Sequence, residues 1–190
     1  MTPPSETGQA ARRVSAFSPE DVQFIAVRRG WLPSGNAAAD PDAAVAACRG
    51  WMAEAAQLLG AFAADSAALE TLLERIFDYD AREVLARPGN QAVMAREGAR
   101  DVLRELASLV LDSAEVDSDR YKEIVAALKE RTGRRGQELF HPVRLALAGS
   151  AGEGEFDRVI LLLDSAARLV WHVPVKSCRR RLIEFCAAMD

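Results

Sequence analysis

Apolar residues recur every three or four positions along most of this chain, a spacing that predicts helices. The clearest stripe comprises Leu69, Leu72, Leu73, Ile76 and Phe77. No convincing alternation of apolar and polar residues marks a strand, although the short apolar run 169–173 is compatible with extended structure. The predicted fold class is therefore all-α, built as two small helical bundles in tandem.

Turn and cap residues divide the helical pattern. Ser18-Pro19 pairs a good N-cap with a proline suited to the first helical position. Arg87-Pro88-Gly89-Asn90 is the strongest internal break, because the residue before proline avoids helical dihedrals and Gly-Asn favours a turn. We expect a disordered tail at 1–16, a proximal helical bundle at 17–86 and a distal helical domain at 90–190.

Charge is distributed unevenly, although the formal net charge is only −4. Residues 1–128 carry 13 Lys/Arg and 20 Asp/Glu, whereas residues 129–190 carry 11 Lys/Arg and 8 Asp/Glu. A basic C-terminal third on an acidic body favours a directed contact with a polyanion. A chance spread of solvated charges is the alternative.

Several functional classes lack their sequence signatures. No apolar run is long enough for a membrane span, and the N-terminus lacks the apolar stretch of a signal peptide, so a cytoplasmic location without a membrane partner is expected. The three cysteines are odd in number and show no CxxC spacing, which argues against a disulfide framework and a four-cysteine zinc site. There is no GxSxG nucleophile and no phosphate-binding loop. We expect no metal, no cofactor and no catalytic residue.

The most specific pattern lies between Tyr121 and Leu163. Thr132-Gly133 is followed by Arg134-Arg135-Gly136, by LFHPVRLALAG at 139–149, and by Gly152-Glu153-Gly154-Glu155-Phe156. In this pattern Pro142 is expected to open a short helix that Gly149 closes, with Arg144 in its first turn. The order and spacing resemble the anticodon-binding, C-terminal region of bacterial glutamyl-tRNA synthetases, a class I family. The resemblance covers about residues 60–190.

The resemblance implies a helix-bundle fold and the anticodon arm of a tRNA, rather than DNA, as the partner. It implies that Arg144 contacts anticodon bases; a salt bridge to a neighbouring carboxylate is the alternative. Phosphate contacts are expected from the basic turn and from the end of the preceding helix, at Arg131, Arg134 and Arg135. The remaining candidate tRNA-binding residues are those expected beside splayed bases: Phe140, Pro142, Glu153, Gly154 and Phe156.

The chain also departs from the family it resembles. Glu153-Gly154 stands where the family has Gly-Pro, and Leu162-Leu163-Asp164 where it has Leu-Leu-Gly. The catalytic His-Ile-Gly-His and Lys-Met-Ser-Lys-Ser signatures are absent from these 190 residues. The leading hypothesis is a free-standing tRNA-binding module that does not catalyse aminoacylation. The alternatives are a protein-interaction domain that lost RNA binding, and a fragment or split subunit of a glutamate–tRNA ligase that acts with a catalytic partner chain.

Overall fold

The computed structural model describes residues 17–32, 41–112 and 115–189, and the predicted tail at 1–16 lies outside these ranges. Within them the chain forms ten helices and no strand, which confirms the all-α prediction. The helices are α1 (Pro19–Arg28), α2 (Pro41–Gly60), α3 (Ser66–Phe77), α4 (Ala81–Ala86), α5 (Pro88–Met94), α6 (Ala99–Leu111), α7 (Ser118–Thr132), α8 (Gln137–Ala148), α9 (Gly154–Ala167) and α10 (Cys178–Met189). No helix in the described ranges is long and apolar enough to cross a bilayer.

Local sequence explains where most of these helices begin and end. Ser18 forms a full capping box with Asp21 at the start of α1. The side chain of Asp117 accepts hydrogen bonds from two backbone amides in the first turn of α7. Gly149 ends α8 with φ at 75°, a left-handed conformation that favours glycine. The predicted start of α1 and the predicted end of α8 are therefore confirmed.

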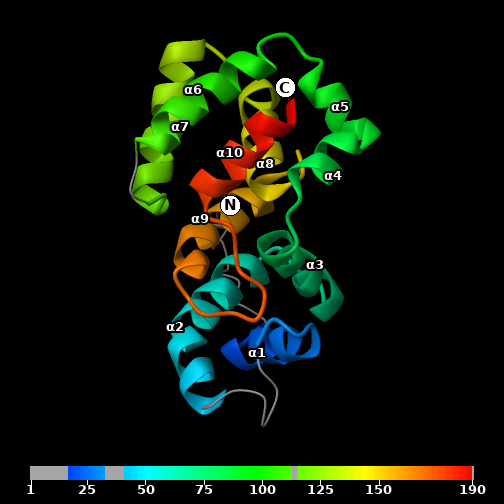
Figure 1. The fold of residues 1–190 in the computed structure, drawn as a ribbon, viewed down its shortest axis with the longest axis vertical. Helices are drawn as coiled ribbons and strands as arrows, with labels where there is room; N and C mark the ends of the chain where they lie inside the picture. The colour runs from blue at the N-terminus through cyan, green and yellow to red at the C-terminus, as the bar shows by residue number, and fades with distance from the viewer. Residues whose placement is uncertain (1–16, 33–40, 113–114, 190) are drawn as a thin grey trace, which may run out of the picture.

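Helix α9 connects the two ends of an elongated molecule (Figure 1). Helices α1, α2 and α3 lie at one end, and helices α4 to α8 lie with α10 at the other. Helix α9 packs against α2 and α3 and also against α8 and α10. One continuous cluster of buried apolar side chains runs from Val22 to Phe185. The division into 17–86 and 90–190 stays a prediction, since α4 belongs to the first range but lies with α5 to α8, and one apolar cluster spans both ranges.

Four aromatic rings form the core of the α1–α3 end. Trp31 stacks on Phe77 with ring centroids 4.1 Å apart, and Trp51 meets Phe77 edge-on at 6.0 Å. The fourth ring, Trp171, comes from the loop between α9 and α10 and contacts both Trp51 and Phe77. That loop carries the run 169–173, which is irregular rather than strand. It lies against the α1–α3 end, where the His172 amide donates to the Trp31 carbonyl.

A buried arginine binds the ends of helices from both parts of the molecule. The Arg181 side chain is fully buried and donates to the carbonyls of Arg75 and Ile76 at the end of α3, of Leu147 in α8, and of Lys176. Burial lowers the pKa of Arg181 to about 10, so the side chain stays cationic at neutral pH. Arg181 contacts no carboxylate among the described residues. The carbonyls at helix C-termini carry partial negative charge, and this charge stabilises the buried guanidinium of Arg181.

One prediction about proline was wrong, and another is confirmed only in part. Pro142 lies inside α8, which begins five residues earlier, at Gln137. Pro142 still lies in the N-terminal half of α8. Proline removes one backbone hydrogen bond there, close to the first-turn amides that have no partner within the helix in any case. The predicted break before Pro88 is present, because α4 ends at Ala86 and Arg87 is extended. Pro88 then starts α5, so Gly89 and Asn90 lie inside a helix and not in a turn.

Candidate nucleic-acid interface

Three interhelical turns contain or border the residues that the sequence singled out. They are the α5–α6 turn at 95–98, the α7–α8 turn at 133–136 and the α8–α9 turn at 149–153. The Arg134 guanidinium lies against Gly98, whose backbone would place a Cβ only 2.7 Å from Arg134 Nε. Gly98 also adopts φ of 79°, so both space and conformation favour glycine there. The first two turns are therefore in direct contact.

Arg144 is held inside the protein at the third turn. Its Nε and Nη2 each donate to one oxygen of Asp157, both at 2.8 Å, and its Nη1 donates to the Gly152 carbonyl at 2.9 Å. The Phe140 ring centroid lies 5.0 Å from the guanidinium carbon. Arg144 is only 8% exposed. This is the salt bridge that the sequence left open as the alternative to base contact.

Asp157 is fixed from a second side by Tyr121. The Tyr121 hydroxyl donates to Oδ1 of Asp157 at 2.8 Å. Burial, with the adjacent Asp157 charge, raises the pKa of Tyr121, so the hydroxyl keeps its proton and remains a donor. Burial by itself lowers the pKa of Arg144, but the hydrogen bonds and the charge of Asp157 outweigh it and raise the pKa overall. The three side chains form one charge-assisted network joining α7, α8 and α9.

Phe140 and Phe156 are both half-buried beside this network. Lys129 lies 5.8 Å from the Phe140 ring centroid, so Phe140 contacts two cationic groups. Gly152 lies directly under Phe156, because a Cβ built there would come within 1.8 Å of the Phe156 ring. Glycine at 152 therefore lets the Phe156 ring pack against the turn.

The candidate residues Glu153 and Gly154 lie at the start of α9. Glu153 is exposed at the N-cap position, and its amide donates to the Glu155 side chain at 3.1 Å. Gly154 is the first residue of α9, and its surroundings leave open space for a side chain. Pro142, by contrast, is buried within α8, away from solvent. Of this group, Glu153 is the residue most accessible to a partner.

The three arginines expected to contact phosphates differ in whether a carboxylate lies close to the guanidinium. Arg131 donates to Glu105 at 3.2 Å, and Arg134 lies within 3.5 Å of both Glu97 and Glu138. Arg135 is exposed and contacts no carboxylate among the residues that the structure describes. Arg135 therefore presents the least compensated charge of the three.

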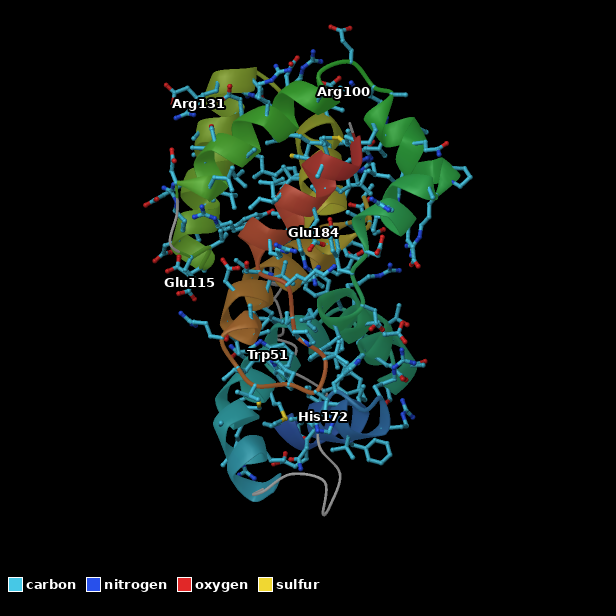
Figure 2. All side chains as sticks on the ribbon, viewed as in Figure 1. Trp51, Arg100, Glu115, Arg131, His172 and Glu184 are labelled. Atoms are coloured by element: carbon cyan, nitrogen blue, oxygen red, sulfur yellow. The ribbon has the colours of Figure 1, made fainter. Side chains whose placement is uncertain are left out.

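Helix packing adds cations that sequence reasoning missed. Arg96 and Arg100 belong to the acidic part of the sequence, yet both are exposed at the α5–α6 turn and the start of α6. Figure 2 shows Arg100 and Arg131 at the same end of the molecule, opposite Trp51 and His172. Lys129 is also exposed there. No local sequence signal links residues about forty positions apart, because their proximity depends on how α6, α7 and α8 pack.

The described residues contain no cluster of three or more His, Cys, Asp and Glu side chains suited to a metal ion. Cys178 is fully buried at the start of α10, and burial raises its pKa despite the arginines that follow it in sequence. Asp164, which replaces the glycine of the resembled family, accepts the backbone amides of Val116 and Cys178 at 2.7 Å each. Asp164 therefore caps α10 and fixes the segment before α7.

Part of this chain is similar to known proteins. The family described as "Anticodon binding domain" matches residues 38–165. Glutamate–tRNA ligase 2 of Syntrophus aciditrophicus is 38% identical over 72 residues, which make up 38% of this chain and 15% of the ligase. Glutamate–tRNA ligase 1 of Ehrlichia ruminantium is 33% identical over 70 residues, 37% of this chain and 16% of the ligase. The chain thus matches less than a fifth of the length of these relatives, and no solved structure matches it significantly. The family match extends over more than half of the chain, which therefore belongs to the anticodon binding domain family.

Proposed function

We propose that this chain binds tRNA at the anticodon arm and does not itself catalyse aminoacylation. The observation that carries the proposal is the exposed basic end formed by the α7–α8 turn and the end of α7, inside the family match. Arg135 and Lys129 lie there without a carboxylate contact among the described residues, and Phe140 lies beside Lys129. Cations that contact phosphates supply affinity, and aromatic rings at the same surface stack on unpaired bases.

In this proposal Arg144 shapes the surface and does not read bases directly. Its ion pair with Asp157 supports that role, because a base could take the same donors only after Asp157 had released them. Each charge-assisted hydrogen bond lost in that exchange would cost about 1.5–3 kcal/mol before any new bond formed. Contacts to the RNA then fall to the exposed residues Arg135 and Glu153 in two turns, and to the half-buried rings of Phe140 and Phe156.

A filter-binding titration with unfractionated tRNA at about 50 mM and about 200 mM salt tests the proposal. Binding that weakens steeply with salt is expected, and Arg135→Ala should weaken it further. Arg49→Ala is the matched control, since Arg49 is exposed on α2 at the opposite end of the molecule and its loss changes the net charge equally. Absence of tRNA binding at protein concentrations of roughly 100 µM in low salt would contradict the proposal and favour a protein-interaction role.

The aminoacylation activity named in the two ligases belongs to proteins of which this chain matches a small part. We propose that any role of these residues in that reaction requires a catalytic domain that they do not themselves contain. Mixing this chain with an excess of a catalytic fragment of a glutamate–tRNA ligase, and measuring charging of tRNA, tests the split-subunit alternative. Charging that rises only when both chains are present would establish that alternative.

A further inference from the structure

Arg96 stands in the α5–α6 turn, immediately after α5 and close to α8. It is exposed, and its Nη1 lies 3.2 Å from Nδ1 of His141. A guanidinium has only donor hydrogens, so Nδ1 of His141 must offer its lone pair. The neutral imidazole then carries its proton on Nε2. This contact joins the α5–α6 turn to α8 on the side where the α7–α8 turn also lies.

The surroundings of His141 maintain this arrangement near neutral pH. Burial, together with the charges of Arg96 and Arg144, lowers the pKa of His141, while Glu153 acts weakly in the opposite direction. The imidazole therefore stays neutral and keeps an acceptor for Arg96. A neutral partner orients a guanidinium without cancelling its charge.

This separates Arg96 from three of the four arginines that the sequence singled out, Arg135 being the exception. Arg131, Arg134 and Arg144 each face a carboxylate, whereas Arg96 contacts none within the described ranges. An arginine that contacts no carboxylate and is already held in one orientation can bind an anion well. Its charge is not neutralised within the protein, and its side chain loses less conformational entropy on binding. Its turn also touches the α7–α8 turn through Arg134 and Gly98.

We propose that Arg96, positioned by His141, binds a phosphate of the RNA backbone, so that the RNA-binding surface extends from the α7–α8 turn across the α5–α6 turn. The inference rests on the proposed function and adds a contact to it. Arg96 supplies charge-assisted hydrogen bonds to a phosphodiester, and His141 is a positioning residue that sets the direction of the guanidinium. The contact is with the backbone and is therefore independent of the anticodon sequence.

The test compares Arg96→Ala, Arg96→Lys and Arg135→Ala with the wild-type chain in tRNA titrations over a range of salt concentrations. Loss of one phosphate contact should weaken binding about five-fold at low salt and make the plot of log K against log salt shallower by about one. Arg96→Lys should restore most of the salt slope but less of the affinity, since lysine keeps the charge and loses the planar fork. Arg49→Ala again controls for net charge.

His141 is tested by removing and restoring its acceptor. His141→Leu should weaken tRNA binding while leaving the salt slope unchanged, because Arg96 keeps its charge but loses its orientation; His141→Gln should recover part of the affinity. Thermal melting of each variant identifies any loss that comes from unfolding. The inference is overturned if Arg96→Ala binds like the wild-type chain while Arg135→Ala is weakened. If the wild-type chain binds no tRNA, the proposed function fails together with this inference.

Discussion

Arg144 and Asp157 are thirteen residues apart in the chain, yet their side chains meet in a two-pronged ion pair with both hydrogen bonds at 2.8 Å. The pair closes the turn between α8 and α9, and Gly152 and Tyr121 each add one hydrogen bond to it. The guanidinium is almost completely buried, so loss of its partner would leave a charge that water cannot fully solvate.

Asp157→Asn should therefore lower the free energy of unfolding by about 2 kcal/mol, measured by urea denaturation. Asparagine keeps the shape of the side chain but removes the charge that Arg144 requires. Glu155→Gln is the control at a nearby carboxylate, and it should change stability by less than about 0.5 kcal/mol. Equal effects of the two substitutions would show that the ion pair contributes nothing specific.

Arg181→Met should be among the most destabilising single changes, at about 3 kcal/mol or more. Methionine replaces the apolar stem but leaves four carbonyls without their donor. Arg180→Met, one position earlier, is the matched control, since Arg180 is exposed and pairs only with Glu184 among described residues. A thermal melt of the two variants gives the comparison, and a similar melting temperature for both would refute the role assigned to Arg181.

The stability of the protein should fall with acidity on account of His141. Its pKa is lower in the folded chain than in the unfolded chain, so between these two values the unfolded state binds more protons. Stability is then fully present above about pH 6.5 and decreases as the pH falls below that value. Urea denaturation between about pH 5 and 8 should show this dependence, and His141→Gln should reduce it.

The pKa of His141 also tests whether Arg96 lies beside it. Arg96→Ala should raise the pKa of His141, because it removes a nearby positive charge and leaves Arg144 and Glu153 in place. Nitrogen-15 NMR of the imidazole measures this directly, and His172, exposed at the opposite end, provides a reference signal in the same spectrum. An unchanged titration of His141 would mean that Arg96 does not lie beside it in solution.

Gly152→Ala should destabilise the α8–α9 turn, since the new methyl group would overlap the Phe156 ring. The loss is expected to be about 1–3 kcal/mol, as for other overpacked sites. Phe156→Ala removes the ring, so the double variant should lose less than the sum of the single variants. A double-mutant cycle from urea denaturation measures the coupling, and strict additivity would contradict the packing of Phe156 on Gly152.

Sequence alone predicted the features that depend on neighbouring residues. The cap at Ser18 and the left-handed glycine at 149 follow from local hydrogen bonds and backbone conformation, and both are confirmed. The position of Pro142 was misjudged because proline is common at a helix start, whereas here the preceding residues extend the helix backwards. The family was predicted from the spacing of short motifs, and the match over 38–165 confirms it.

The electrostatic partners could not be predicted in the same way. The sequence offered no particular carboxylate as the partner of Arg144, because the distance between Arg144 and Asp157 depends on how α8 and α9 pack. Arg96 lies 45 residues before His141, in a segment that composition marks as acidic. Such pairs become visible only when the helices are placed in space, and they decide which arginines remain free to meet a partner.

The aromatic cluster at the α1–α3 end also has a consequence for biosynthesis. Trp171 completes the packing of Trp51 and Phe77, although α3 ends at residue 77. During translation at about 5–20 residues per second, the first three helices would wait several seconds or more for Trp171 to be synthesised and to leave the ribosome. The α1–α3 end of this molecule is therefore completed late, only after synthesis has passed Trp171.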